Sequence, residues 1–349
     1  MIQFDSAVLP SAAQHDAIRV FLNADHPDFE IFYLAQSDPT ARMAEDVISG
    51  LQHSPKRLPS AYLYDCQGSL IYEQITQLPE YYQTRTESAL LRQIAPDLSF
   101  RSGAVEIIEL GSGSSEKTRI LLDAWKKQEM AVTYIPIDVS PQMLADTASR
   151  LIRDYPMLRV LGLVGRYEEA LAVLPESPNR LILFLGGSIG NFTPEEQTAF
   201  LSRLKALSMP GTRLLLGFDY QPHAGKPVEV ILQAYNDQAG VTASFNRNIL
   251  THINNRLNAD FDLSAWEHQA IYNPQQHQIE MTLISRCAQT IQVLGQPCQF
   301  ASGERILTEI SRRYEPAAFA RWFETQGWRC LESWSDARRY YGLMLLEMV

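Results

Sequence analysis

Short apolar segments alternate with longer amphipathic segments between residues 87 and 224, and this alternation restricts the possible folds more than any other feature. Apolar runs of about five to seven residues are typical of buried strands, and longer amphipathic runs are typical of helices. Strands that alternate with helices form βαβ units, which build a parallel sheet covered by helices on both faces. The predicted strands are 105–110, 132–137, 158–164, 180–185 and 213–218, and the predicted helices are 116–126, 141–153 and 193–207.

Local signals fix the start of one predicted helix. Thr193 is a good N-cap residue, Pro194 suits the first helical position, and Glu196 completes a capping box. Toward the C-terminus a helix at 316–326 and strands at 328–333 and 341–348 resume the pattern. We therefore predict an α/β fold.

Two stretches, 1–86 and 225–312, do not share the alternation. A chain of 349 residues is long enough for two domains. We expect residues 87–224 plus 313–349 to form the sheet domain, and residues 1–86 plus 225–312 to pack together as a second, discontinuous domain.

The composition predicts a globular cytoplasmic protein. The net charge of −10 argues against nucleic acid as a partner. No apolar run approaches the ~20 residues that span a bilayer, and residues 1–5 lack the pattern of a signal peptide. The spacing of the cysteines predicts neither a disulfide framework nor a zinc site, and no metal site is expected. The four cysteines are Cys66, Cys287, Cys298 and Cys330.

Glycines lie where the first predicted strand meets its helix, in the segment 109–116 (ELGSGSSE). Gly111 and Gly113 allow close approach of a ligand, and the helix start offers free N–H groups. A dinucleotide-binding loop has a third glycine, whereas the glutamate that ends this segment would repel a pyrophosphate. Asp138, at the end of the second predicted strand, is placed to reach ribose hydroxyls. The pattern favours S-adenosylmethionine, whose carboxylate could meet Lys117.

A second glycine segment offers a competing interpretation. Residues 186–190 (GGSIG) match the Gly-x-Ser-x-Gly elbow of serine hydrolases, with Ser188 as nucleophile. The elbow requires a helix that begins almost at the serine, but the predicted helix begins about five residues later, near Thr193. A catalytic histidine would have to come from a set without distinctive context: His223, His252, His268 and His277. We consider this alternative weaker.

Further segments from about residue 57 to the C-terminus form a specific combination. They are 64–65 (YD), 68–69 (GS), 78–82 (LPEYY), 84–87 (TRTE), 109–113 (ELGSG), 115–119 (SEKTR), 184–186 (FLG), 188–191 (SIGN), 234–235 (AY) with Asp237, 240–243 (GVTA), 245–248 (FNRN), 279–281 (IEM), and 308–309 (TE) with Ser311. In this combination the chain resembles the histidine Nα-methyltransferases of ergothioneine biosynthesis. The resemblance implies a class I methyltransferase (Rossmann-like) domain with a second, discontinuous substrate-binding domain, and S-adenosylmethionine as cofactor.

The resemblance also implies a set of cofactor contacts: Gly111, Lys117, Asp138, Arg166 and Tyr167. The last two depart from the family pattern, which has Asp-Phe there with the acidic side chain near the adenine amino group. Arginine cannot accept that hydrogen bond. We expect adenine to be held instead through backbone atoms and stacking on the tyrosine.

The substrate contacts that the resemblance implies suit a small zwitterion with an imidazole ring. They are Tyr64, Tyr81, Asn191, Tyr235, Met281, Glu309 and Ser311. An amide and a tyrosine hydroxyl can bind the α-carboxylate and α-amine, while a carboxylate and a serine hydroxyl can bind the two ring nitrogens. Tyr64 and Asn191 are the expected catalytic residues, with Tyr64 as a proton relay. Considered singly, each of these residues could instead be an ordinary core, capping or surface residue.

The implied reaction is transfer of the sulfonium methyl group to the α-nitrogen of L-histidine, repeated up to trimethylhistidine (hercynine). A monomer is expected. Three alternatives stay open: an Nα-methyltransferase of another aromatic amino acid, a non-catalytic cofactor-binding sensor, and the Ser188 hydrolase.

Overall fold

A computed structural model describes residues 16–18, 20–22, 29–34, 38–102, 106–126, 132–177 and 179–349 of the chain. The side chains of residues 99–102 are not described. The expectations for residues 1–5 and for Val105 lie outside these residues. Within the described ranges, no helix has the length and apolar character needed to cross a membrane.

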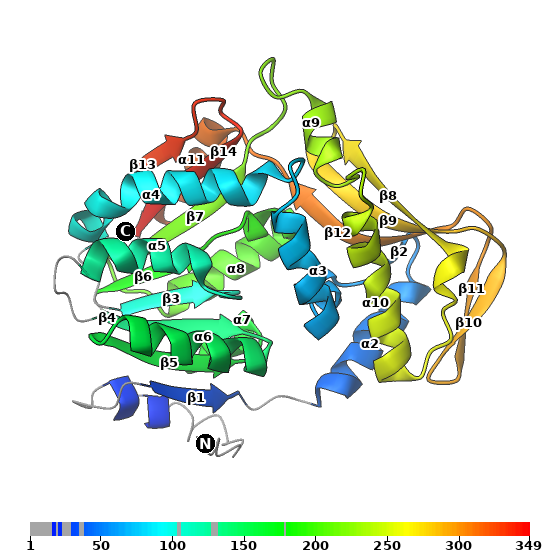
Figure 1. Ribbon diagram of the computed structural model, residues 1–349, viewed down its shortest axis with the longest axis horizontal. Helices are drawn as coiled ribbons and strands as arrows, with labels where there is room; N and C mark the ends of the chain where they lie inside the picture. Colours follow the sequence, from blue (N-terminus) through cyan, green and yellow to red (C-terminus); the bar gives the residue numbers. More distant parts are fainter. Residues whose placement is uncertain are drawn as a thin grey trace.

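One large sheet of eight strands organises the left part of the molecule in Figure 1. Its strand order is β1-β5-β4-β3-β6-β7-β14-β13. The strands are β1 (Phe29–Tyr33), β5 (Leu158–Val164), β4 (Val132–Asp138), β3 (Glu106–Leu110), β6 (Arg180–Phe184), β7 (Arg213–Asp219), β14 (Tyr341–Met348) and β13 (Trp328–Ser335). The strands from β1 to β7 pair in parallel, and β3 and β6 are buried at every residue, as expected for strands covered on both faces.

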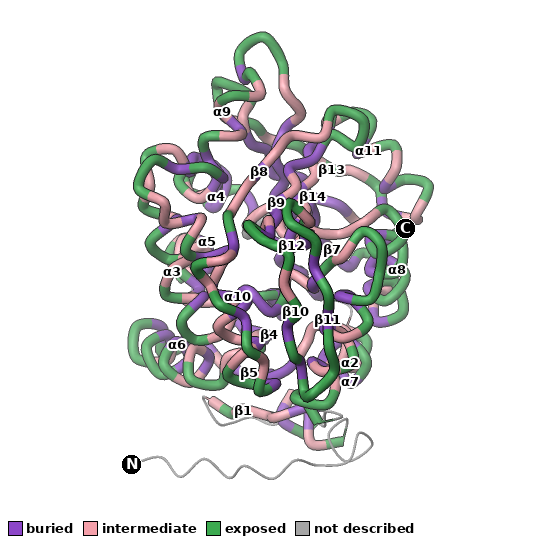
Figure 2. Tube along the Cα trace, turned by 90° about the vertical axis from the view of Figure 1, so that its right-hand side faces the viewer, coloured by how far each residue is buried: buried purple, intermediate pink, exposed green. Residues whose placement is uncertain are grey.

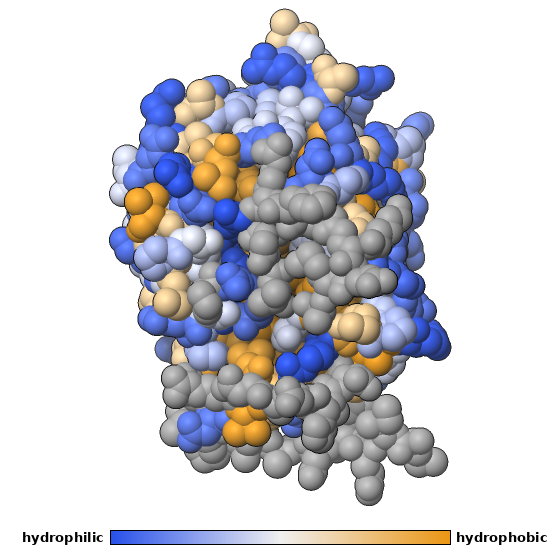
Figure 3. Space-filling view, turned by 90° about the vertical axis from the view of Figure 1, so that its left-hand side faces the viewer, coloured by the Kyte–Doolittle hydropathy of each residue, from blue (hydrophilic) through white to orange (hydrophobic). Residues whose placement is uncertain are grey.

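Helices cover both faces of this sheet (Figure 1). On one face α4 (Tyr82–Ser102), α5 (Glu116–Lys126) and α6 (Pro141–Asp154) share a core that includes Leu91 and Leu121. The opposite face is covered by α7 (Tyr167–Val173), α8 (Pro194–Ala206) and α11 (Pro316–Thr325). The end of the sheet that faces away from the rest of the molecule shows hydrophobic groups dispersed among hydrophilic ones (Figure 3).

The predicted helices 116–126 and 193–207 are confirmed as α5 and α8. The Thr193 hydroxyl accepts from the Glu196 backbone N–H at 3.2 Å, and the Glu196 carboxylate accepts from the Thr193 N–H at 2.8 Å. The reciprocal capping box thus begins α8 where the sequence predicts it.

Two strand arrangements differ from the sequence prediction. β14 pairs antiparallel with both β7 and β13, and the short 336–340 connection permits only antiparallel pairing between β13 and β14. β1 pairs in parallel with β5 at the sheet edge, although the sequence assigns all of 1–86 to the other domain. Residues 29–33 extend this edge because they lie beside a strand with an unpaired side.

The second lobe, which we define as residues 39–81 and 225–312, forms the right part of Figure 1. Its sheet has the order β2-β12-β9-β8 and packs with helices and 3-10 helices from both stretches of the chain. These elements are β2 (Lys56–Arg57), β12 (Arg305–Arg312), β9 (Gln278–Ser285), β8 (Trp266–Asn273), α2 (Pro39–Gln52), α3 (Cys66–Thr76), α9 (Val228–Gln233), α10 (Val241–Leu257), η1 (Ser60–Leu63) and η3 (Leu263–Ala265). One hydrophobic core joins both stretches of the chain through residues such as Val47, Leu63, Ile249 and Leu283.

A hairpin of β10 (Gln289–Val293) and β11 (Gln296–Phe300) closes the outer end of the second lobe. Buried and exposed residues alternate along it, as Figure 2 shows. Ile291 and Phe300 point into the core of the lobe. The hairpin therefore completes that core and lies away from the sheet ends where the site forms.

Candidate functional site

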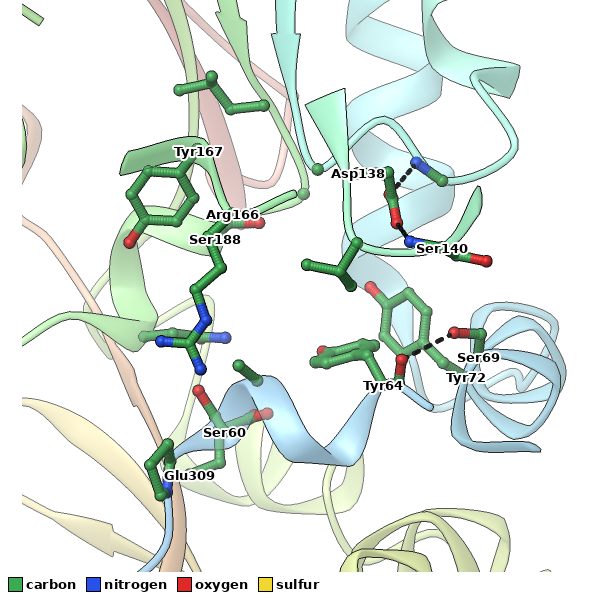
Figure 4. A pocket seen from close by; sticks show the side chains of 18 of the residues that line it. Ser60, Tyr64, Ser69, Tyr72, Asp138, Ser140, Arg166, Tyr167, Ser188 and Glu309 are labelled. Atoms are coloured by element: carbon green, nitrogen blue, oxygen red, sulfur yellow. Dashed lines mark hydrogen bonds between the residues drawn. The ribbon is translucent and has the colours of Figure 1, made fainter. Parts of the chain in front are cut away.

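A cleft of about 1740 Å³ separates the carboxyl ends of the parallel strands from the second lobe. The ends of β3, β4, β5 and β6 line one side, and α2, η1, α3 and β12 line the other. In Figure 4, Asp138 and Ser140 lie on one side of the cavity, Arg166 and Tyr167 lie opposite, and Tyr64 and Tyr72 come from the second lobe. Ligands of open α/β sheets bind at this edge, where strand order reverses.

The glycine loop and Asp138 are in direct contact. Gly111 and Gly113 have φ angles of 70° and 50°, and a Cβ atom at either position would meet open space. The Asp138 carboxylate accepts from the Gly113 N–H at 2.8 Å and from the Ser140 N–H at 3.0 Å. Burial raises the pKa of Asp138, while these backbone donors oppose the rise. Each carboxylate oxygen keeps a lone pair for a hydroxyl group, so the loop fits a ribose.

Lys117, a predicted cofactor contact, is held by a carboxylate that the sequence analysis leaves without a role. Its ammonium lies 2.5 Å from Glu87, which is fully buried and also accepts from the Gly186 N–H at 2.9 Å and from the Tyr341 hydroxyl at 3.0 Å. Burial alone would lower the pKa of Lys117, but Glu87, together with Tyr72 and Glu109, raises it above its ordinary value. Glu87 thus ties α4 and α5 to the loop after β6.

Arg166 reaches across the cleft to the second lobe. Its guanidinium donates to the Tyr62 hydroxyl at 3.2 Å and lies 3.6 Å from the Asp46 carboxylate. A second ion pair, between Arg42 and Glu169 at 3.0 Å, also connects α2 with α7. Arg166 therefore joins the two walls of the cleft.

Tyr167 packs into the sheet core beside the cleft. Its ring centroid lies 5.9 Å from that of Phe192 and 5.6 Å from that of Phe200. The next residue, Glu168, also lines the cleft and has one buried carboxylate oxygen without a hydrogen-bond partner among the described residues. An acceptor is thus present at this end of the cleft, although Arg166 cannot serve as one.

A smaller pocket of about 60 Å³ lies at the inner end of the cleft. Its lining shares Tyr64, Gly186, Ser188, Asn191 and Glu309 with the cleft. The structure brings all seven predicted substrate contacts together in this lining: Tyr64, Tyr81, Asn191, Tyr235, Met281, Glu309 and Ser311.

A buried polar cluster supports one wall of the small pocket. The Tyr235 hydroxyl donates to Ser311 at 2.9 Å, and Arg313 donates to the same serine at 2.7 Å and to Tyr235 at 3.1 Å. Arg313 also lies 2.6 Å from Asp219, which pairs with Lys226 at 2.5 Å. Burial lowers the pKa of Lys226 to about 8, although Asp219 opposes the shift. Two cations thus share one carboxylate; of these three groups Arg313 and Asp219 line the pocket.

Glu309 lies on β12 directly opposite Met281 of β9. It is 8% exposed, and one of its carboxylate oxygens has no hydrogen-bond partner among the described residues. Burial raises its pKa to about 7, and Arg313 limits the rise. A carboxylate in such surroundings favours a ligand with an N–H group.

Aromatic rings form the opposite wall. The ring centroid of Tyr64 lies 5.5 Å from that of Tyr72 and 5.3 Å from that of Phe245, both in edge-to-face contacts. The hydroxyl oxygens of Tyr72 and Tyr81 lie 3.3 Å apart. Burial raises the pKa of Tyr64 well above its ordinary value. The sequence analysis did not identify Tyr72 or Phe245 as lining residues, because apolar spacing does not distinguish a pocket wall from a core.

The loop after β6 does not form a hydrolase elbow. Ser188 begins a short 3-10 helix (Ser188–Asn191) and donates to the Leu185 carbonyl at 3.0 Å, and α8 begins only at Pro194. The four candidate histidines have other partners: His223 with Arg339, His252 with Tyr62, His268 with Tyr235 and His277 with Tyr272. Because Thr193 caps α8, Asn191 is not required as the cap and lines the pocket.

Residues 43–348 match the family described as histidine-specific, S-adenosylmethionine-dependent methyltransferases. The chain belongs to this family. Membership confirms the predicted class of enzyme and its S-adenosylmethionine cofactor, and it agrees with the α/β strand order described above.

Three relatives illustrate how far this methyltransferase resembles known proteins. A histidine N-alpha-methyltransferase of Mycolicibacterium smegmatis is 41% identical over 315 residues, which cover 90% of this chain and 97% of the relative. The protein of the same name from Mycobacterium tuberculosis is 40% identical over 87% of this chain and 94% of the relative. Ergothioneine biosynthesis protein 1 of Neurospora crassa is 30% identical over 84% of this chain but only 33% of its own length.

Proposed function

We propose that this methyltransferase methylates the α-amino nitrogen of L-histidine, up to trimethylhistidine, as a step of ergothioneine biosynthesis. The names of the relatives support this substrate and this pathway. The observation that carries the proposal is the small pocket, in which Glu309 and Ser311 face the same space as Asn191 and Tyr235.

The residues along the cleft fit the cofactor. Asp138 would accept the ribose hydroxyls, Gly111 and Gly113 would leave room beside the loop, and Tyr167 and Glu168 would contact adenine. Bound S-adenosylmethionine supplies an electrophilic methyl group on a sulfonium. Lys117, already paired with Glu87, would add positive charge near the cofactor carboxylate.

The small pocket fits histidine. Glu309 would accept one ring N–H, and Ser311 would bond the other ring nitrogen. Asn191 and Tyr235 would bind the α-amine and α-carboxylate, and the Arg313 guanidinium, which donates to the Tyr235 hydroxyl, would add positive charge beside the carboxylate. A phenyl or indole ring would leave the polar atoms of Glu309 and Ser311 unpaired, which disfavours other aromatic amino acids.

The α-amine must be neutral to react. Burial and the sulfonium of the bound cofactor both disfavour an ammonium cation in the pocket, so they promote loss of the amine proton. Tyr64 would relay that proton, since it lies in both the cleft and the small pocket. Alignment of the amine with the methyl group by Asn191 and Tyr235 would provide most of the rate enhancement. The surrounding tyrosine rings would stabilise the growing ammonium.

A substrate panel tests the proposal. Purified protein is incubated with S-adenosylmethionine and each free amino acid, and the products are identified by mass spectrometry. We expect mono-, di- and trimethylhistidine. Methylation of tryptophan or tyrosine without histidine would refute the substrate assignment, and calorimetric binding of cofactor and histidine without turnover would indicate a sensor.

We also propose the two-domain division 87–224 plus 313–349 and 1–86 plus 225–312, adjusted by the transfer of β1 and of residues 82–86, which begin α4, to the sheet domain. The shared hydrophobic core of the second lobe supports it. The monomeric state and the cytoplasmic location stay predictions.

A further inference from the structure

Gln83, the second residue of α4, combines burial with an unused hydrogen-bonding group. Its side chain lines the small pocket and is 4% exposed. Neither the nitrogen nor the oxygen of its amide has a hydrogen-bond partner among the described residues. No role for Gln83 follows from the sequence alone.

A buried amide without partners is unfavourable. A buried polar group that has lost its hydrogen bonds to water and gained none in the protein destabilises the folded state. Gln197, another buried glutamine, shows the usual arrangement, because its amide nitrogen bonds the carbonyls of Ile189 and Phe192 at 3.1 and 3.3 Å. The free amide of Gln83 therefore indicates that a ligand in the pocket completes its hydrogen bonds.

The surroundings of Gln83 favour a ligand with a negative group. It lies in the first turn of the 21-residue helix α4, whose backbone N–H groups are directed toward the helix start. Arg313 lines the same pocket and carries a positive charge, which Asp219 in the same lining partly offsets. The start of α4 and Arg313 both favour an anionic group.

We propose that Gln83 binds the amino-acid head group of the substrate, an inference that rests on the proposed function. Its Nε2 group donates to the α-carboxylate, and its Oε1 atom accepts an N–H of the neutral α-amine. The substrate is favoured over the cofactor because Gln83 lines the small pocket with Tyr235 and Ser311 but does not line the cleft beside the glycine loop.

This geometry predicts a dependence on the degree of methylation. The neutral amine of histidine has N–H bonds, whereas that of Nα,Nα-dimethylhistidine has none. Oε1 can therefore hold the amine of histidine and of monomethylhistidine, but not that of the dimethyl intermediate. The contact between Nε2 of Gln83 and the α-carboxylate is the same for histidine, monomethylhistidine and dimethylhistidine.

The test compares Gln83→Leu and Gln83→Glu with the wild-type enzyme by calorimetry, with S-adenosylhomocysteine bound. We expect Gln83→Leu to weaken L-histidine binding at least tenfold and dimethylhistidine binding less, with unchanged affinity for S-adenosylhomocysteine. Gln83→Glu should weaken histidine binding further, because its carboxylate would face that of the substrate. The Tm of Gln83→Leu should equal or exceed that of the wild type, whereas the control Gln197→Leu should lower it.

Three results would overturn the inference. One is histidine binding by Gln83→Leu within twofold of the wild type. Another is a fall in Tm, or a failure to fold, comparable to that of Gln197→Leu, which would make Gln83 a structural residue. The third is a wild-type enzyme that binds no histidine, which would overturn the proposed function as well; the first two leave that function intact.

Discussion

Glu309→Gln should make the free enzyme more stable at alkaline pH while weakening its hold on histidine. Burial raises the pKa of Glu309 from 4.5 to about 7. The folded state therefore binds this proton more tightly than the unfolded state. The contribution of Glu309 to stability is most favourable below pH 4.5 and is lost as the pH rises through 7.

The size of the effect follows from the shift. A change of one pKa unit corresponds to ~1.4 kcal/mol, so the rise to about 7 makes ionised Glu309 cost ~3 kcal/mol at pH 8. Glutamine has the same shape and does not titrate. We expect the variant to exceed the wild type in free energy of unfolding by ~3 kcal/mol at pH 8 and to match it near pH 4.5.

Urea unfolding of both proteins at the two pH values measures this difference, and calorimetry with S-adenosylhomocysteine bound measures histidine affinity. Loss of a charged acceptor for the ring N–H should weaken histidine binding ~10–100-fold. A stability difference that is the same at both pH values would refute the raised pKa. Equal loss of cofactor and histidine binding would refute the placement of Glu309 in the substrate pocket.

Three further substitutions test other parts of the site. Asp138→Asn should weaken S-adenosylhomocysteine binding ~10-fold or more in calorimetry, because a hydrogen bond to a charged acceptor is lost; unchanged affinity would exclude a ribose contact. Arg166→Ala should change the free energy of unfolding by ~1 kcal/mol or less, because its pair with Asp46 is partly exposed; a larger loss in urea unfolding would contradict this. Arg313→Met should lower the free energy of unfolding by ~1–3 kcal/mol, because Ser311 and Tyr235 lose a buried donor while Asp219 keeps its pair with Lys226. Arg313→Lys should lower it less; equal losses in urea unfolding would show that the charge is not what matters.

The sheet domain was largely predictable because its signals are local. The apolar runs, the capping box at Thr193 and the glycines at 111 and 113 each act over a few residues, and the structure places them as expected. β1 was missed because Phe29–Tyr33 has no helix-and-strand pattern around it and gains its place only from the neighbouring edge of β5.

The site was predictable only in part. The pocket residues were named through the resemblance, since Tyr64, Tyr235 and Glu309 lie far apart in the chain and carry no joint pattern of their own. The partners that give these residues their properties were not foreseen. Asp46 meets Arg166 across 120 positions, and Arg313 meets Asp219 across 94. Such pairings arise from tertiary packing, which sequence periodicity does not encode.

The first turn of α4 connects the substrate pocket with the cofactor cleft. Gln83 and Glu87 are four residues apart, so they lie on the same side of one helical turn. One faces the small pocket, and the other holds Lys117 and the backbone of Gly186. A ligand that orders this turn at one site should raise the affinity of the other site for its own ligand. We therefore expect cooperative binding, in which cofactor tightens histidine by the same factor by which histidine tightens cofactor.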